Sequence, residues 1–229
     1  RLVIQRGNER REIRAGCVVA ADGAASTTAR SFDLPRQELL AGVQVEVPLV
    51  RESDRTVIYL DPVYEGGYAW LFPKGAAANL GVGCVGPAKP LKLLEDLRQR
   101  LLAKGVIKPG VLALGGGAIP VGGPREPVVN GNLILAGDAA GLTHPITGAG
   151  IPQALNSGQL AGEAALALAG GKAETSQEYA HELAMVYKGY LGRALKRRQR
   201  MLAGWGSRDF SGLMAEAWPG WKQQGGTRA

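Results

Sequence analysis

The chain has 229 residues, of which 45% are hydrophobic and 21% are charged, a composition typical of globular proteins rather than disordered ones. Its length allows one large core or two smaller ones. The formal net charge is +7, but nine cations lie between Lys188 and Arg208 or at Lys222 and Arg228, so the excess belongs largely to the C-terminal region. These cations form no recognisable nucleic-acid-binding module, and we expect no nucleic-acid partner.

Two cysteines are present, Cys17 and Cys84. Both lie in apolar, strand-like runs, which favours buried free thiols in a reducing compartment over a disulfide. No cysteines and histidines cluster at metal-ligand spacing, and we expect no metal site. The sequence also contains no uninterrupted apolar run of about 18 residues, the length that predicts a spanning helix. Together these features predict a cytoplasmic protein.

The N-terminal residues predict a β-hairpin followed by a short strand. Residues 2–6 and 9–14 alternate polar and apolar side chains on either side of a Gly-Asn turn. Residues 17–21 form a short apolar run, predicted as a buried strand, with Asp22 at its carboxyl end. Residues 26–32 are predicted as a short helix, because a serine at its start suits the N-cap position. From its position at this strand-to-helix turn alone, Asp22 is interpreted as a cap of the helix.

Between residues 39 and 121 the pattern changes to that of an antiparallel sheet. Aromatic side chains alternate along one predicted strand and so share one of its faces: Tyr68, Trp70 and Phe72. A loop over residues 73–78 would set this strand against the next one. The two pairs predicted by that register are Trp70 with Gly81 and Tyr68 with Gly83. An aromatic wall beside space over the glycines would suit a long apolar substrate, whereas the alternative interpretation is plain core packing.

Three further segments are predicted as helical or apolar. Residues 90–104 carry leucines at helical spacing and predict an amphipathic helix that ends at Gly105. Residues 174–203 predict one long helix with cations near its end. Its expected apolar positions are Tyr179, Leu183, Val186, Tyr190, Leu191 and Leu195. The aromatic stretch at 210–221, beside the basic cluster at 196–200, either touches a membrane surface peripherally or packs onto the antiparallel sheet predicted above or onto a partner chain.

The most informative stretch runs from residue 130 to 171. An apolar run at 133–136 predicts a buried strand, Gly137 and Asp138 follow at its end, and a helix of small residues begins near Gly150. A carboxylate at a strand tip can accept hydrogen bonds from sugar hydroxyls, and a helix N-terminus attracts anions. The arrangement suits an anionic or ribose-bearing cofactor. In the alternative interpretation, Asp138 is a turn residue in an ordinary strand–loop–helix crossover.

Two motifs resemble those of flavoproteins with the para-hydroxybenzoate hydroxylase fold. Residues 18–26, VVAADGAAS, resemble the Asp-Gly motif of that superfamily, and residues 137–150, GDAAGLTHPITGAG, resemble its second FAD motif. Within the superfamily, residues 68–75, YAWLFPKG, and residues 79–83, NLGVG, resemble the geranylgeranyl reductase group. The resemblance covers roughly residues 1–170.

The resemblance implies an α/β (α+β) fold. A partial FAD-binding, Rossmann-like domain would comprise residues 1–34 and 126–172, with an antiparallel-sheet substrate domain inserted at 35–125 and a helical region at 173–229. The FAD contacts implied by the two motifs are Asp22, Gly23, Gly137, Asp138, Ala139, Pro145, Thr147, Gly148, Ala149 and Gly150. Those implied for the substrate are Tyr68, Trp70, Phe72, Gly81 and Gly83. Backbone N–H groups near Thr147–Gly150 would stabilise negative charge on the flavin.

The same resemblance implies an FAD-dependent oxidoreductase. The expected reaction reduces isoprenoid, geranylgeranyl-type carbon–carbon double bonds by hydride transfer from reduced flavin, with NADPH or another reductant as electron donor. No residue is an evident proton donor, and His144 is expected to be structural. The alternatives are an FAD-dependent monooxygenase or halogenase of the same fold, and a non-catalytic binding or scaffold remnant without FAD.

One family feature is missing ahead of Asp22. These flavoproteins open with a strand and a Gly-x-Gly-x-x-Gly turn that holds the FAD pyrophosphate, and no such unit precedes the Asp-Gly motif here. Residues 115–117 are three glycines, but no dinucleotide-type helix is predicted after them. We therefore expect the chain to be the C-terminal portion of a longer flavoprotein, inactive alone, with the missing N-terminal segment as its partner.

Overall fold

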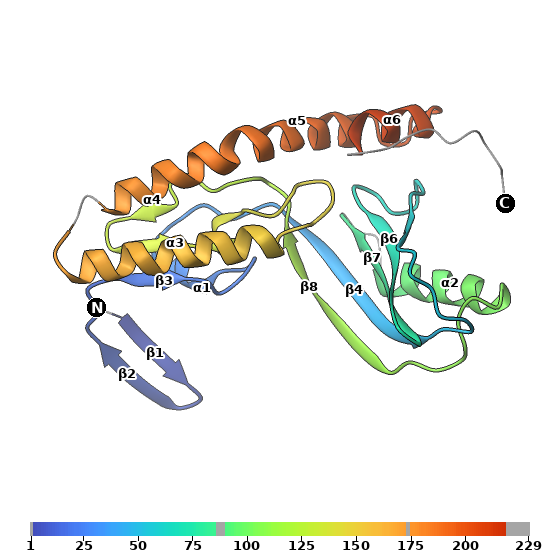
Figure 1. Ribbon diagram of the computed structural model, residues 1–229, viewed down its shortest axis with the longest axis horizontal. Helices are drawn as coiled ribbons and strands as arrows, with labels where there is room; N and C mark the ends of the chain where they lie inside the picture. Colours follow the sequence, from blue (N-terminus) through green and yellow to red (C-terminus); the bar gives the residue numbers. More distant parts are fainter. Residues whose placement is uncertain (1, 86–89, 173–174, 219–229) are drawn as a thin grey trace. The chain divides into compact units, whose positions relative to one another are not determined.

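The computed structural model describes residues 2–85, 90–172 and 175–218, which form two compact units. The motif unit comprises Arg1–Gln37, Gly123–Thr143 and Ala149–Gly192. The sheet unit comprises Glu38–Gly122, His144–Gly148 and Arg193–Ala229. The described residues combine helices with largely antiparallel strands (Figure 1), which confirms the expected fold class. The four domain boundaries expected from the sequence stay a prediction.

The motif unit is built on a three-stranded sheet of order β3-β10-β9. Its strands are β3 (Val18–Ala20), β9 (Val129–Asn130) and β10 (Leu133–Leu135). β10 pairs with β3 in parallel and with β9 antiparallel. Every residue of β10 is fully buried, as its apolar sequence predicts. β3 is only partly buried, contrary to expectation, because it lies at the margin of this sheet and leaves Val19 38% exposed.

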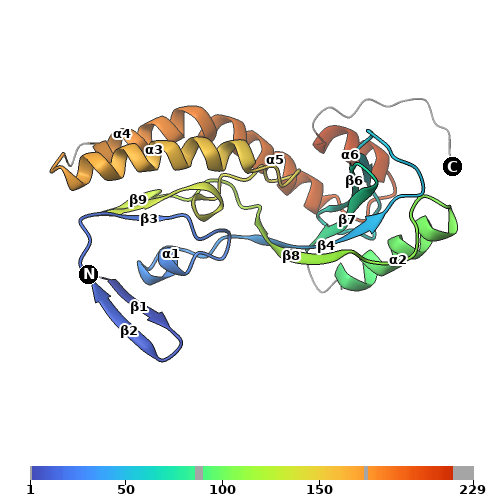
Figure 2. The ribbon, with the colours of Figure 1, turned by 60° about the horizontal axis from the view of Figure 1, so that its bottom comes forward.

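Helices α3 (Ile151–Ala169) and α4 (Thr175–Leu183) lie side by side in both ribbon views (Figure 1, Figure 2). Small side chains on α3, among them Ala161 and Ala164, let it pack closely in the core that contains β10. Tyr179 of α4 reaches the same core and donates a 2.5 Å hydrogen bond to the carbonyl oxygen of Leu135.

The predicted N-terminal hairpin is formed by β1 (Leu2–Arg6) and β2 (Glu9–Ile13), which pair antiparallel.

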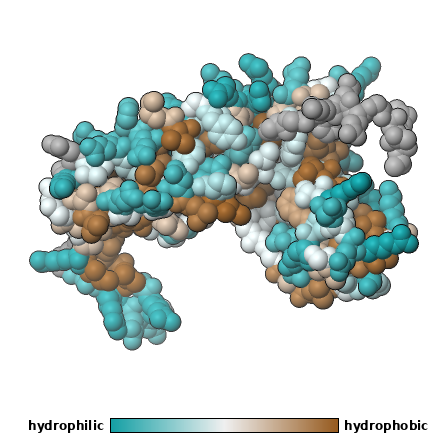
Figure 3. Space-filling view, in the orientation of Figure 1, coloured by the Kyte–Doolittle hydropathy of each residue, from teal (hydrophilic) through white to brown (hydrophobic). Residues whose placement is uncertain are grey.

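Apolar side chains also gather on the outer face of α3 (Figure 3). Ile151, Leu155 and Leu166 are 77%, 71% and 78% exposed. Their spacing places them on one side of the helix, away from the alanines that face the core. Within the described residues, this side of α3 is therefore solvent-facing and apolar.

The predicted long helix runs without a break from Thr175 to Ala203. It consists of α4, a π-helical segment over Ala184–Lys188, and α5 (Gly189–Ala203). Two residues expected on its apolar face, Val186 and Tyr190, are instead 52% and 49% exposed. The π-helical turn holds an extra residue, so the buried stripe continues through other side chains: Leu183, Tyr187 and Leu191.

The sheet unit contains a five-stranded antiparallel sheet of order β5-β6-β7-β4-β8. Its strands are β4 (Leu39–Pro48), β5 (Val57–Tyr59), β6 (Tyr68–Lys74), β7 (Ala77–Cys84) and β8 (Ala113–Pro120). Helix α2 (Pro90–Ala103) covers one face, where Leu94, Leu97 and Leu101 pack against the apolar side chains of the strands. The strand predicted at 55–60 is shorter than expected.

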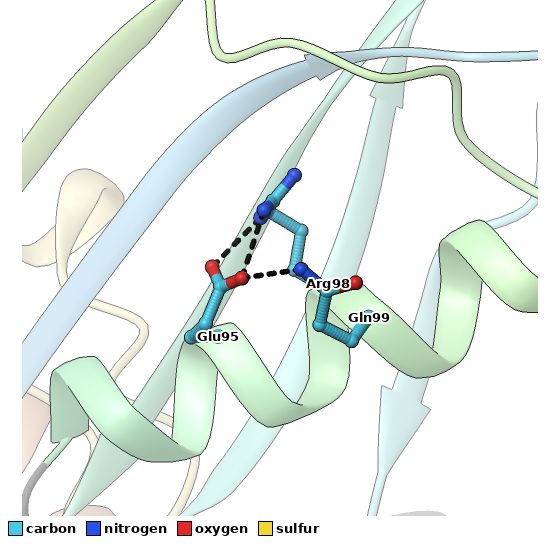
Figure 4. A network of polar contacts seen from close by, with 3 residues as sticks. All are labelled: Glu95, Arg98 and Gln99. Carbon is cyan, nitrogen blue, oxygen red and sulfur yellow. Dashed lines mark hydrogen bonds and ion pairs between the residues drawn. The ribbon is translucent and has the colours of Figure 1, made fainter.

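Helix α2 carries a small polar network of Glu95, Arg98 and Gln99 (Figure 4). Arg98 donates two 2.8 Å hydrogen bonds to the Glu95 carboxylate, and Gln99 donates one of 2.6 Å. Surface pairs at this helical spacing contribute only about 0.2–0.5 kcal/mol each. The network therefore supports α2 locally and leaves its apolar side to hold the sheet.

The described part of the C-terminal aromatic stretch packs within the sheet unit. Met214 and Ala217 of α6 (Phe210–Ala217) are buried with Met201 and contact Leu60. Trp205 donates a 2.9 Å hydrogen bond to the carbonyl oxygen of Pro62. Of the interpretations left open by the sequence, packing onto the sheet is the one seen here; Trp221 lies outside the described residues. Across the described ranges, no helix is both long and apolar enough to span a bilayer.

Candidate functional site

The two acidic strand tips lie at the same edge of the motif-unit sheet. Asp22 follows β3 and Asp138 follows β10, and these strands pair in parallel with Leu135 opposite Ala20. Parallel strands deliver their carboxyl ends to one edge, where ligands of open α/β sheets bind. The Gln37 side-chain amide donates to the backbone oxygen of Asp138 at 2.8 Å and to that of Ala24 at 3.1 Å. The structure therefore links the two motifs through a residue for which the sequence gives no signal.

The Asp22 carboxylate faces the start of α1 (Thr27–Ser31). It accepts hydrogen bonds from the Ser26 hydroxyl at 2.5 Å, the Thr27 hydroxyl at 3.1 Å, and the backbone N–H and hydroxyl of Thr28 at 2.9 and 3.0 Å. Burial raises the pKa of Asp22, but these hydrogen bonds outweigh it and lower the pKa to about 2. These contacts are those of a residue that caps the start of α1. Ser26 is the N-cap residue, as predicted.

The Asp138 carboxylate is half-buried and has little support from the described protein atoms. Its recorded hydrogen bond is a long one of 3.5 Å from the Thr143 hydroxyl. Burial raises the pKa of Asp138, and that hydrogen bond only partly opposes the effect. Gly150, the N-cap of α3, lies so near that a Cβ there would be 3.3 Å from the Asp138 Oδ1 atom. An acceptor with spare capacity therefore stands beside the N-terminus of α3.

Close backbone packing fixes the turn around Asp138. Gly137 has a φ of +56° and donates its N–H to the buried Ser157 hydroxyl at 2.9 Å. Ala139 is fully buried. Gly141 has a φ of +72°, and a Cβ there would approach the Gly123 carbonyl oxygen to 2.3 Å, so any larger residue would displace the turn. Ser157 is a second contributor that the sequence does not reveal, since it reads as one more small residue of α3.

The predicted FAD loop is divided between the two units. Residues 144–148 belong to the sheet unit, whereas residues 137–143, 149 and 150 belong to the motif unit. In the sheet unit, Tyr68 donates a 2.6 Å hydrogen bond to the Thr147 carbonyl oxygen. The His144 Nδ1 atom accepts from the Thr147 N–H at 3.2 Å, and the His144 carbonyl accepts from the Gly148 N–H at 2.9 Å. Two of the N–H groups expected to face the flavin are therefore engaged within the loop.

His144 itself is 4% exposed. Burial lowers its pKa, and the nearby Arg197 charge lowers it further. A neutral imidazole is consistent with Nδ1 acting as an acceptor. The contacts agree with the structural role expected from the sequence.

Arg198 holds the same loop from α5. Its side chain is 1% exposed, and Nη1 donates to the carbonyl oxygens of Gly66 at 2.7 Å and Pro145 at 3.2 Å. The Nε atom lies 3.5 Å from a Glu38 carboxylate oxygen. In the sequence this arginine is one of the basic cluster at 196–200, and its burial is not predicted. The missed signal is its helical spacing from two buried residues, Leu191 and Met201.

The register predicted for the aromatic strand is confirmed, with Trp70 opposite Gly81 and Tyr68 opposite Gly83. The aromatic rings also share a face, since Trp70 lies 5.6 Å from Tyr68 and 5.9 Å from Phe72 between ring centroids. The space over the two glycines is filled, however. A Cβ on Gly81 would lie 2.2 Å from the indole of Trp70, and one on Gly83 would lie 2.7 Å from Leu40. At these two positions the core-packing interpretation describes the structure.

The remaining sequence expectations concern metals and thiols. In the parts of the chain that the structure describes, no group of histidine, cysteine, aspartate and glutamate side chains could hold a metal ion. Both cysteines are free, as expected. Cys84 is buried in the sheet-unit core, whereas Cys17 is only half-buried because it precedes the marginal strand β3.

Sequence comparison finds relatives over most of the chain. The digeranylgeranylglycerophospholipid reductase of Methanococcus vannielii is 33% identical over 184 residues, covering 77% of this chain and 46% of that protein. That of Methanospirillum hungatei is 32% identical over 218 residues, covering 87% and 52%. By sequence, this chain is similar to digeranylgeranylglycerophospholipid reductases over most of its length. It spans about half the length of the curated relatives it matches.

The fold of this chain recurs in solved structures. A geranylgeranyl bacteriochlorophyll reductase-like protein from Thermoplasma acidophilum matches 95% of this chain and 66% of its own, with a TM-score of 0.68 and 24% identity. A probable FAD-dependent monooxygenase from Pseudomonas aeruginosa matches 88% and 59%, with a TM-score of 0.60 and 24% identity. At these identities the likeness establishes the fold alone. No family model matches the chain.

Proposed function

We propose that this chain is part of an FAD-dependent reductase that saturates carbon–carbon double bonds of isoprenoid lipids. The observation that carries the proposal is the parallel pairing of β3 and β10, because it brings the Asp-Gly and Gly-Asp motifs to one sheet edge. The names of the relatives support the substrate class, since they are reductases of digeranylgeranylglycerophospholipids. The structural neighbours support the cofactor, since one of them is the FAD-dependent monooxygenase described above.

The residues at this edge fit a flavin nucleotide. Asp138 has unused acceptor capacity suited to hydroxyl groups of the ribityl chain, and Gly150 packs directly beside it at the start of α3. Because the Thr147 and Gly148 N–H groups are bonded to His144, we assign the contact with flavin negative charge to the N-terminus of α3. A bound flavin would supply the hydride, and the chain would bind and orient it.

Asp22 and Arg125 would act at the other motif. Asp22 holds the start of α1 through its four hydrogen bonds, so its contribution to the pyrophosphate environment would be indirect. Arg125 lies near enough to Asp22 for the two charges to interact, and burial lowers the pKa of its guanidinium while the Asp22 charge opposes that shift. A guanidinium there suits a phosphate oxygen. Gln37 would keep both motifs in register.

In the sheet unit, the aromatic strand would contribute an apolar wall. Tyr68, Trp70 and Phe72 would limit water beside the substrate, and Tyr68 would also hold the loop that carries Thr147. The reductant that recharges the flavin would be NADPH or another donor. Contact with a membrane surface would involve the exposed cations Arg197 and Arg200, because the lipid substrates named for the relatives reside there.

Anaerobic turnover tests this proposal. The complete gene product, purified with its flavin and reduced with dithionite, is mixed with a geranylgeranyl lipid, and saturated product is measured by mass spectrometry. We expect turnover without oxygen. Product that forms only with oxygen would instead indicate a monooxygenase or halogenase. A colourless protein that does not take up added FAD would contradict the proposal and favour a non-catalytic scaffold.

A further inference from the structure

Glycines form a row across the face of the sheet opposite α2. Residues directly opposite each other in neighbouring strands point to the same face. Gly83 of β7 pairs with Gly42 of β4, and Gly42 pairs with Gly117 of the edge strand β8. In the next row, Gln44 lies between Gly81 and Gly115. Three adjacent strands therefore lack side chains along one line of this face. The ribbon of β4 and β8 is labelled in Figure 2.

The two ends of this glycine row differ in what covers them. Gly81 and Gly83 lie under Trp70 and Leu40, as described above. At the other end, a Cβ on Gly117 would meet no atom within 4 Å, and one on Gly115 would only reach Gln44 at 4.0 Å. The open space expected over β7 is therefore found two strands away, over β8.

A hollow of about 270 Å³ lies at this open end. It is lined by residues 42–44 of β4, residues 116–119 of β8 and Trp70. None of these residues is charged. Trp70 is 8% exposed and its indole Nε1 has no hydrogen-bond partner among the described atoms, although buried indole N–H groups usually find one. The lining is that of a ligand site, largely apolar with a few polar groups.

The open glycines are not required by the backbone. Neither Gly115 nor Gly117 has a positive φ, and the space above each of them would accept a side chain. Glycine weakens a strand interior, and in strands it often marks a place where a ligand approaches closely. Absence of side chains at Gly115 and Gly117 thus creates space at a cost in strand stability.

We propose that this glycine lane (Gly42, Gly115 and Gly117 with Trp70, Gln44 and Ile119) binds a section of the polyprenyl chain of the substrate. The inference rests on the proposed function and specifies where the chain lies. A prenyl chain is apolar, uncharged and slim, which matches a glycine floor beside an indole. The volume is just below the range of about 300–1,000 Å³ for sites that enclose whole ligands, so the lane takes part of a long chain. The width of the lane at Gly117 then selects chains without bulky groups.

A graded substitution at Gly117 tests the lane. Gly117→Ala and Gly117→Val add side chains into the space without straining the backbone, and valine also suits an edge strand. The matched control is Ala113→Val, which adds a similar group to the same face of β8 beyond the hollow. Binding of geranylgeraniol to the complete gene product is followed by tryptophan fluorescence, and unfolding is followed by circular dichroism.

We expect Gly117→Val to weaken binding about tenfold or more, with Gly117→Ala between it and wild type, because overfilling a packed site disrupts the fit. Thermal stability should be unchanged or higher, and Ala113→Val should bind as wild type does. If the wild type binds and reduces prenyl substrates while Gly117→Val binds them equally well, the proposal for the glycine lane is wrong and the proposed reductase function is unaffected. If wild type neither binds nor reduces any prenyl compound, both proposals fall.

Discussion

The phenol of Tyr68 donates a 2.6 Å hydrogen bond to the carbonyl oxygen of Thr147. Tyr68, the first residue of the aromatic strand, therefore also anchors the loop that contains the predicted FAD motif. The same loop is held by Arg198 through the Pro145 carbonyl. Substrate-facing and cofactor-facing candidates of the sheet unit are thus joined by two hydrogen bonds to loop carbonyls, and a change at either donor should affect both.

Tyr68→Phe should destabilise the sheet unit modestly. The substitution removes the hydroxyl and with it the hydrogen bond to the Thr147 carbonyl, a loss of about 1 kcal/mol. For a chain of this size that corresponds to a fall of about 2–4 °C in melting temperature. Tyr59→Phe is the control, because the Tyr59 hydroxyl makes no recorded hydrogen bond in the described ranges. Equal melting temperatures for Tyr68→Phe and wild type would show that the hydrogen bond is not formed in solution.

Arg198→Met should be more damaging than Tyr68→Phe. Methionine keeps much of the side-chain volume but leaves the Gly66 and Pro145 carbonyls unsatisfied, which costs roughly 2 kcal/mol. The full penalty for breaking a buried ion pair does not apply, because the side chain of Glu38 is 52% exposed and can be solvated. Urea unfolding measures the difference.

Two companion variants isolate the role of Arg198. Arg198→Lys should recover little stability, since an ammonium cannot reproduce the planar fork of a guanidinium. Arg200→Met, in the exposed part of the same helix, should unfold like wild type. A stable Arg198→Met protein would contradict the assignment of this arginine as the anchor of the loop.

Much of this fold is predictable from local sequence pattern. The apolar run before Asp138, the small residues of α3 and the alternation of Tyr68 and Phe72 each specify an element whose periodicity is strong. The register of β6 on β7 also follows from a short loop with few alternatives. These features depend on neighbours close in sequence, so one chain is enough to find them.

What the sequence does not reveal depends on distant contacts. Gln37 donates to the backbone of Asp138, about a hundred positions away, and no local pattern indicates such a bridge. Arg198 is concealed in a run of cations because burial of a guanidinium is exceptional. Space over Gly81 was expected from the absence of its side chain, but whether Trp70 fills it depends on the rotamer of the indole.

The stability that Asp22 contributes should depend on pH. Its pKa in the folded chain is about 2, below its ordinary value of 3.8, because hydrogen bonds from the start of α1 outweigh the opposing effect of burial. A depressed folded pKa contributes stability above the unfolded pKa, and that contribution is lost as the pH falls from about 4 towards 2. Asp22→Asn should therefore lower the urea midpoint more at pH 6 than at pH 2.5. An equal effect at both pH values would show that ionisation of Asp22 is not what holds α1.

Asp138→Asn should separate stability from cofactor binding. Burial raises the pKa of Asp138, so its ionised form at pH 7 is disfavoured in the folded chain, and that penalty disappears as the pH falls below the folded pKa. A neutral amide avoids the penalty, and the flavin-free protein should melt at an equal or higher temperature. Flavin retention should fall, because asparagine presents one acceptor oxygen where the carboxylate presents two.

The ratio of flavin to protein after gel filtration measures retention, with Asp54→Asn on an exposed loop as the matched control. If Asp138 serves flavin binding and not folding, its substitution should raise or preserve the melting temperature while it lowers flavin retention. Full retention by Asp138→Asn would remove this carboxylate from the proposed flavin site. A large fall in the melting temperature of the flavin-free variant would instead make Asp138 a structural residue of its turn.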